Sequence, residues 1–271
     1  MKLPENIVGF CLKDPNPSDG KSFGHELMPR LTAAAGDVDL EPLCSPVSDQ
    51  QWISACVPNA TADAVELCNA VDGLPVWQIS RLQIYFNSRS WMYKAQLESG
   101  EITHVEMKDE GSFISAAFEA MSFFGICPEN LWDYKPDKVN LRPDIKAIWY
   151  ALKHKLDSYY KIRATGSGLL DEVRSAIGGK HPVVISVPVP ESFLQTNGPT
   201  TIGVSSLSER IVGRHAVVAM GRIGENIKIR NSWGTSWRAG GYALLTPEWF
   251  TSGLVEDACV PTNGMSFRDT P

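Results

Sequence analysis

The sequence lacks the long apolar segments that place a protein in or across a membrane. Residues 1–14 contain no uninterrupted apolar stretch of signal-peptide length, and no later segment reaches membrane-spanning length. It also lacks blocks of like charge, internal repeats and low-complexity tracts. We therefore expect no membrane partner, and a location in the cytoplasm or export without a recognisable signal peptide.

Cysteine is scarce as well, with six residues in a chain of 271. No two of them form a Cys-x-x-Cys pair, which argues against zinc binding and thioredoxin chemistry. The content is too low for a disulfide scaffold, although one or two bridges remain open. We expect no metal and no cofactor. The six are Cys11, Cys44, Cys56, Cys68, Cys127 and Cys259.

The charge balance excludes a further class of partners. The formal net charge is −6 and the isoelectric point is near 5.4, which argues against nucleic-acid binding. A chain that is 43% apolar and 21% charged can bury a sizeable core, as one domain or as two lobes. We expect a monomer.

The first half of the chain reads as helical after an irregular arm. Residues 1–36 are irregular and rich in turn-forming residues from Asp14 to Gly20. Apolar residues then recur every three or four positions, the spacing of a helix with one buried face. The predicted helices cover residues 56–71, 79–97, 112–124 and 143–154, and Gly125 is the expected stop signal of the third.

The second half is mainly β. The valine-rich run 182–189 predicts a buried strand, and the run 190–213 predicts a long loop. Further strands are predicted over 158–163, 215–220, 226–231 and 241–245, with a helix over 169–177. Helices followed by strands are typical of an α+β protein with two lobes.

Cys56 is the first candidate for chemistry, because it lies where the first predicted helix begins. The positive end of the helix dipole and the unpaired N–H groups of the first turn favour a thiolate, which is the nucleophilic form. Gln50 precedes it by six residues, and Pro58 suits the first turn. This stretch alone is equally consistent with a small buried cysteine on an amphipathic helix.

His215 and Asn231 lie far downstream, on two successive predicted strands. A hairpin of these strands would place them side by side, where the asparagine carbonyl can accept the imidazole N–H and leave the other ring nitrogen for a thiol. Trp233 could cover that hydrogen bond and exclude water from it. Either residue alone is more typical of a structural role, but the combination with Gln50 and Cys56 points to catalysis.

At this point the chain resembles the papain-like cysteine peptidases. The resemblance rests on Asp49-Gln50 with Cys56, on His215-Ala216-Val217, and on Asn231-Ser232-Trp233-Gly234 through Gly241-Tyr242. The stretches Val38–Leu40, Asp109–Ser112 and Gly125–Glu129 extend it, the last two particularly toward the bacterial-type branch of the family. It covers residues from about 37 to 250.

The resemblance implies a papain-like two-lobed fold, with a helical lobe, an antiparallel β-barrel-like lobe and the active-site cleft between them. Residues 37–271 would form the peptidase domain, mainly helical over about 45–155 and mainly β over about 156–250. Residues 1–36 would be an arm that packs across or beside the cleft as a propeptide-like inhibitory strap, or else a structural belt.

The resemblance also implies roles for individual residues. Cys56 would be the nucleophile, His215 its proton partner in an imidazolium–thiolate pair, and Asn231 the residue that orients His215. The Gln50 side chain and the Cys56 backbone N–H would form the oxyanion hole. Gly111 would bind the substrate backbone, or else be an ordinary turn glycine. The implied activity is peptide-bond hydrolysis through a thioester acyl-enzyme, on a peptide or protein substrate.

The sequence departs from the family pattern around the nucleophile. Gln51, Ser54-Ala55 and Val57 stand where the family usually has glycine, Gly-Ser and an aromatic residue. A side chain at 51 or 54 restricts the backbone if φ is positive there. Ile53 replaces a cysteine that often forms a disulfide, and Arg214 places a cation beside His215. Two alternatives therefore stay open: a papain-fold protein that binds or is weakly active, and a transpeptidase or deamidase that uses the same triad.

Overall fold

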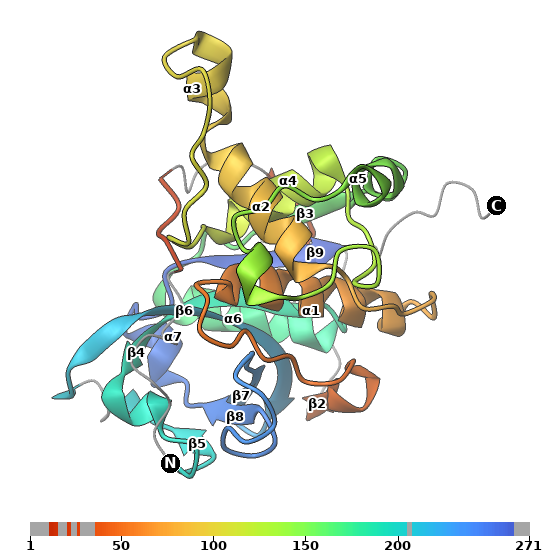
Figure 1. Ribbon diagram of the computed structural model, residues 1–271. Coiled ribbons are helices and arrows are strands. Elements are labelled where there is room, and N and C mark those ends of the chain that lie inside the picture. The colour runs from red at the N-terminus through yellow and green to blue at the C-terminus, as the bar shows by residue number, and fades with distance from the viewer. Residues whose placement is uncertain (1–10, 16–20, 23–25, 28–35, 205–207, 263–271) are drawn as a thin grey trace.

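A mostly antiparallel sheet crosses the molecule, with helices packed on both of its faces (Figure 1). The computed structural model describes residues 11–15, 21–22, 26–27, 36–204 and 208–262. The helices are α1 (Cys56–Val71), α2 (Arg81–Met92), α3 (Lys94–Ser99), α4 (Ile114–Phe124), α5 (Ile145–Ala151), α6 (Gly166–Gly178) and α7 (Glu248–Thr251). The strands are β1 (Lys21–Ser22), β2 (Val38–Asp39), β3 (Ser158–Lys161), β4 (Val183–Pro190), β5 (Thr201–Ile202), β6 (Ile211–Ile223), β7 (Asn226–Arg230), β8 (Tyr242–Leu245) and β9 (Ala258–Thr262).

The long strand β6 organises the sheet. The strand order is β1-β3-β9-β4-β6-β7-β8-β5, and β2 pairs with β6 outside this path. Only the end pairs β1–β3 and β5–β8 are parallel among the described strands. The sheet is open, since β1 and β5 form its two ends. This arrangement agrees with the predicted α+β class.

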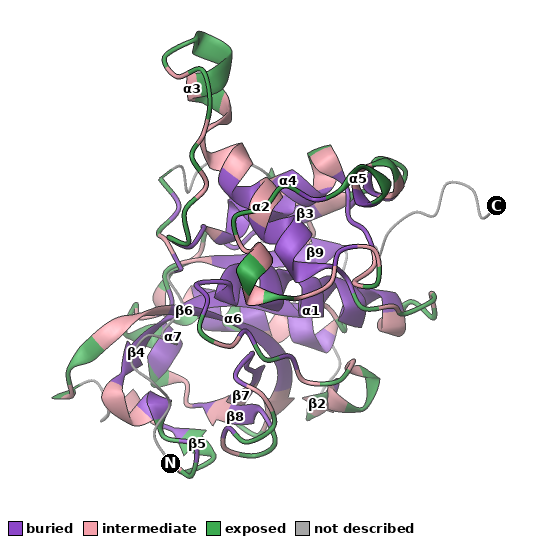
Figure 2. Ribbon diagram, in the orientation of Figure 1, coloured by how far each residue is buried: buried purple, intermediate pink, exposed green. Residues whose placement is uncertain are grey.

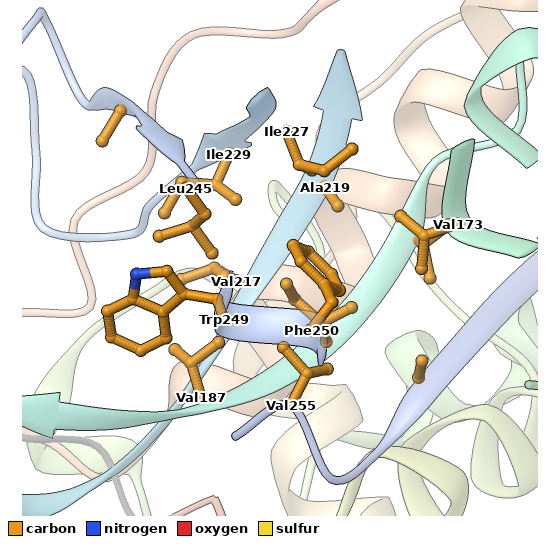
Figure 3. Packing of buried hydrophobic residues seen from close by; sticks show 14 of the residues in the cluster. Val173, Val187, Val217, Ala219, Ile227, Ile229, Leu245, Trp249, Phe250 and Val255 are labelled. Atoms are coloured by element: carbon orange, nitrogen blue, oxygen red, sulfur yellow. The ribbon is translucent and has the colours of Figure 1, made fainter. Parts of the chain in front are cut away.

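The two central strands are buried on both faces. Val183, Ile185 and Val187 of β4 point into a cluster with α6 and α7, whereas Val184 belongs to a second cluster that includes α1. In β6 the neighbours Val217 and Val218 divide between the clusters in the same way. Figure 3 shows the first cluster around Trp249 and Phe250. Burial on both faces explains why the valine run 182–189 is continuous rather than alternating.

Helix α1 is the central element of the helical half. It is buried from Cys56 to Asn69 and appears purple along its length in Figure 2. Helix α4 ends before Gly125, as predicted, and Gly125 adopts a φ of 75°. A Cβ at this position would lie 1.7 Å from the Ala151 carbonyl oxygen, so the close approach of α4 to the end of α5 requires glycine.

Several predicted boundaries differ from the structure. The helix predicted over 79–97 is broken at Tyr93 into α2 and α3. Part of the loop predicted over 190–213 is strand, because β6 starts at Ile211, and the same run holds β5 and a 3-10 turn over Glu191–Leu194. Strand β9 has no counterpart in the prediction. It holds Cys259 and Val260 against β3 and β4, with little alternation to reveal it.

The described parts of the arm contact the body of the molecule. Strand β1 pairs with β3, with Lys21 beside Tyr160, and Leu27 packs against the cluster of α6 and α7. The other residues of the predicted arm, 1–10, 16–20, 23–25 and 28–35, lie outside the described residues.

Glu66 of α1 gives the fold a pH-dependent stability. Burial raises the pKa of Glu66 from 4.5 to about 7, and the neighbouring Asp63 carboxylate adds to this rise. Hydrogen bonds that the Ser45 hydroxyl and the Ile79 N–H donate to the Glu66 carboxylate oppose it. Between these two values the folded protein holds a proton that the unfolded chain has lost. The free energy of unfolding should therefore fall as pH rises, by about 3 kcal/mol in total. Urea unfolding between pH 4.5 and 7 should show this fall in the parent and not in Glu66→Gln; parallel curves would contradict it.

Candidate active site

Cys56 is the first residue of α1 and is completely buried. The residue before the helix, Ala55, has no side chain that could cap the first turn. Burial raises the pKa of the Cys56 thiol, and hydrogen bonds to the sulfur from the backbone N–H groups of Ala216, Val57 and Cys56 itself oppose that rise. The sulfur therefore lies against the residue that follows His215 in β6.

His215 and Asn231 meet across the hairpin of β6 and β7. The His215 Nε2 lies 2.7 Å from the Asn231 Oδ1, and the Ser232 backbone N–H donates to the same oxygen at 2.8 Å. Two donors on one oxygen fix the amide orientation, so Nε2 must carry the ring proton. The Nδ1 has no hydrogen-bond partner within the described part of the chain. Contrary to the prediction, His215 lies within its strand rather than at the start.

Trp233 covers this hydrogen bond. The ring centroids of Trp233 and His215 lie 4.5 Å apart, with an interplanar angle of 30°, and the Trp233 side chain is buried. Trp237 packs perpendicular to it at 5.8 Å. Apolar cover keeps water from the imidazole–amide contact and strengthens it.

Gln50 is buried beside the same segment. Its Oε1 accepts a hydrogen bond from the Ser232 Oγ at 2.8 Å, and its Nε2 donates to the Ile53 carbonyl at 3.1 Å. Its backbone N–H donates to the Ser232 carbonyl at 2.8 Å. These contacts bring the Gln50 amide to the loop that leads into Cys56.

The residues that depart from the family pattern are accommodated in two ways. Gln51 adopts a φ of 56°, the left-handed conformation that favours glycine, whereas Ser54 does not have positive φ. The Arg214 guanidinium turns to the Glu256 carboxylate at 3.1 Å and to the Ser186 Oγ at 3.0 Å. The cation next to His215 is therefore neutralised by a carboxylate.

Burial is the main influence on the pKa values of Cys56 and His215. It raises the pKa of Cys56 to about 12, and Asp109 adds to this rise. It also lowers the pKa of His215 to about 4, against the hydrogen bond with Asn231. Both directions favour a neutral thiol and a neutral imidazole, which differs from the imidazolium–thiolate pair expected from the resemblance.

The arm passes over this site. The Cys11 N–H donates to the Arg214 carbonyl at 3.3 Å, and the Leu12 N–H donates to the Ser112 carbonyl at 3.0 Å. Burial raises the pKa of the Cys11 thiol well above its usual value, and the nearby Cys56 adds to this rise. The arm thus connects segments on both sides of Cys56.

A buried ion pair fastens the arm beyond the site. Asp14 accepts hydrogen bonds from the Lys161 Nζ at 2.7 Å and from the Ser115 Oγ at 2.6 Å. Both charged side chains are buried, so removal of either partner would be strongly destabilising.

Gly111 lies near the site, but its backbone N–H has a partner in the protein. It donates to the Tyr85 hydroxyl at 2.8 Å, and the adjacent Ser112 pairs with the arm instead. Sequence reasoning missed Tyr85, Ser112 and the carboxylate of Asp109. Ser112 directly follows Gly111, which the resemblance had pointed to, whereas no sequence signal links Tyr85 to the candidate site.

The arrangement combines a thiol, an imidazole held by an amide, and nearby amide donors, a set suited to acyl transfer. All six cysteines are free thiols, and no cluster of three or more potential ligands that could hold a metal occurs in the described residues. Across the same residues, no helix has the length and apolar character needed to cross a membrane.

Known structures share this architecture. Xylellain, a cysteine protease from Xylella fastidiosa, matches with a TM-score of 0.76 and 24% identity over 95% of this chain and 96% of its own. Procathepsin B from Trypanosoma congolense matches with a TM-score of 0.70 and 15% identity over 95% of this chain and 87% of its own. At these identities the likeness establishes the fold.

A curated relative supports the same conclusion from sequence. An uncharacterised peptidase C1-like protein of Acanthamoeba polyphaga mimivirus is 29% identical over 204 residues, which are 72% of this chain and 62% of the relative. The chain thus spans less than two thirds of that relative's length. No family model matches the sequence.

The strained backbone at Gln51 can be relieved. Gln51→Gly should raise the free energy of unfolding by about 1 kcal/mol, because a left-handed residue with a side chain costs about 1–2 kcal/mol and glycine gives back part of this in chain entropy. Lys180→Gly, at a φ of 63° outside the site, is the matched control and should give a similar gain. Urea unfolding measures both, and an unchanged midpoint for Gln51→Gly would refute strain at this position.

Proposed function

We propose that this chain, whose fold is papain-like, is a cysteine peptidase that hydrolyses peptide bonds through Cys56, His215 and Asn231. The observation that carries the proposal is the 2.7 Å contact between His215 Nε2 and Asn231 Oδ1. This contact leaves the unprotonated His215 Nδ1 without a hydrogen-bond partner in the described part of the chain. The next residue, Ala216, donates its backbone N–H to the Cys56 sulfur. The names of the structural relatives, xylellain and procathepsin B among them, support the same activity.

The proposed reaction begins with formation of the thioester. The His215 Nδ1 takes the proton of the Cys56 thiol, and the sulfur attacks the carbonyl carbon of the substrate. His215 then gives that proton to the leaving amine, and a thioester to Cys56 remains. Asn231 holds the imidazole in the required tautomer throughout.

The second half returns the enzyme to its start. Water loses a proton to His215 as it attacks the thioester, and the Cys56 sulfur leaves with a proton from the imidazole. In both halves negative charge develops on the former carbonyl oxygen. Donors from the Gln50 side chain and the Cys56 backbone would stabilise it, each by about 2.7–4 kcal/mol in comparable sites.

We also propose that the arm inhibits the enzyme by occupying the place of the substrate. Cys11 and Leu12 use backbone hydrogen bonds to Arg214 and Ser112 that an extended peptide would need. The Ser112 backbone is then a better candidate for binding substrate than Gly111, whose N–H is held by Tyr85. The stem bromelain precursor matches 96% of this chain and the bromelain protease of Ananas comosus 84%, which supports a propeptide-like arm.

Labelling with a peptidyl epoxide tests the nucleophile. Mass spectrometry should find the label on Cys56, because in the proposed mechanism His215 activates this thiol. Cys56→Ala should abolish the label, while Cys44→Ala, at a half-buried thiol, should leave it unchanged. A Cys56→Ala protein that labels as well as the parent would disprove the assignment. Cleavage products analysed with added amine separate hydrolysis from transfer.

A proline in the arm tests the inhibition. Leu12→Pro removes the N–H that donates to the Ser112 carbonyl, and loss of one hydrogen bond of about 1 kcal/mol should raise turnover of a small peptide about fivefold. Lys13→Ala keeps the backbone and removes only an exposed 3.7 Å ion pair with Glu256, so it should change little. Deletion of residues 1–36 should act in the same direction. Equal or lower turnover in both arm variants would count against an inhibitory arm.

A further inference from the structure

Two chain segments approach each other beside the nucleophile. One, residues 51–55, leads directly into Cys56. The other, residues 108–112, ends in Ser112, which pairs with the arm. No disulfide joins them, because every cysteine is a free thiol. Their relative position depends on polar contacts.

Asp109 and Tyr85 supply these contacts. The Ser54 backbone N–H donates to both Asp109 carboxylate oxygens, at 2.9 and 3.2 Å, and the Ser54 Oγ donates to the Asp109 carbonyl at 3.4 Å. The Tyr85 hydroxyl donates to the Asp109 Oδ1 at 2.7 Å and accepts the Gly111 N–H at 2.8 Å. One hydroxyl and one carboxylate therefore connect Ser54 with Gly111.

The connection is anchored in the interior of α2. Tyr85 is fully buried, and Arg89, one helical turn later, is buried with its guanidinium 3.8 Å from the tyrosine ring. Arg89 donates to the carbonyl of Lys108 and to the Asn140 Oδ1. Helix α2 thus contacts the segment 108–112 at Lys108, before Asp109, and at Gly111, after it.

We propose that Tyr85 and Asp109 are positioning residues, which set the loop before Cys56 and the segment 108–112 in register for reaction. This inference rests on the proposed function. Ser54 lies two residues before the nucleophile, so its N–H contact with Asp109 fixes the turn that presents the Cys56 backbone N–H. Gly111 lies one residue before Ser112, so its contact with Tyr85 fixes the edge that an extended peptide would meet.

The Tyr85 contact and the Asp109 contact should affect different kinetic constants. In the full-length protein, Tyr85→Phe keeps the ring but frees the Gly111 N–H, and should raise KM about fivefold with a smaller change in kcat. Asp109→Asn keeps the size but leaves one acceptor oxygen where there were two, and should lower kcat about tenfold by loosening the oxyanion turn. Tyr93→Phe is the matched control, since it removes a similar 2.8 Å bond to the neighbouring Glu110 at the surface.

Amide hydrogen exchange provides a readout that does not depend on activity. Tyr85→Phe should speed exchange in the peptide containing Gly111, and Asp109→Asn in the peptide containing Ser54, while Tyr93→Phe speeds neither. Faster exchange with no peptide turnover in any variant, the parent and Leu12→Pro included, would refute the proposed function and leave the connection intact. Faster exchange with KM and kcat equal to those of Tyr93→Phe would overturn the positioning role, as would unchanged exchange.

Discussion

The ion pair between Asp63 and Arg230 is the constraint on which the site depends. The Arg230 Nε lies 2.9 Å from the Asp63 Oδ2, and both side chains are almost fully buried. Asp63 lies on α1, two turns after Cys56, and Arg230 directly precedes Asn231. A single charged contact therefore fixes the helix that begins at Cys56 against the strand that leads to Asn231. The same guanidinium also donates to the carbonyls of Ser45 and Pro46, and these hydrogen bonds offset part of the cost of burying it.

Polar contacts that are buried or partly buried hold several pairs of segments of this chain in register. Asp14 with Lys161 fastens the arm, and Asp109 with Ser54 holds the entry to α1. Arg214 with Glu256 removes a charge that would oppose protonation of His215. Each such pair is directional, so it fixes one geometry where apolar packing alone would allow several. Since all six thiols are free, these pairs act where a covalent bridge could have acted.

Much of the candidate site could be predicted from sequence, because its signals are local. Helix spacing predicted α1, and its first residue coincides with Cys56. The hairpin that brings His215 to Asn231 followed from two strands close in sequence. The partners of Gln50, Tyr85 and Asp109 could not be predicted in this way. Those contacts join residues 24 to 182 positions apart, and a polar residue does not reveal its partner by spacing.

The fold was predictable to a similar extent and for similar reasons. The valine run of β4 identified a buried strand, whereas the start of β6 at Ile211 has no apolar alternation and is partly exposed. The break at Tyr93 between α2 and α3 was also missed, because the local pattern stays helical on both sides. The protonation of the pair could not be predicted, since it depends on burial beneath residues that are distant in sequence.

The alternation of β4 and β6 between two clusters bears on how the protein unfolds. Neighbouring residues such as Val217 and Val218 contribute to different cores, so the sheet belongs equally to both halves of the molecule. Neither half can lose its strands without exposing the apolar surface of the other. The border between the two clusters is therefore not a boundary between folding units, and the whole body should melt in one cooperative transition. The described parts of the arm contribute no residue to β4 or β6, so we expect the arm to detach before that transition.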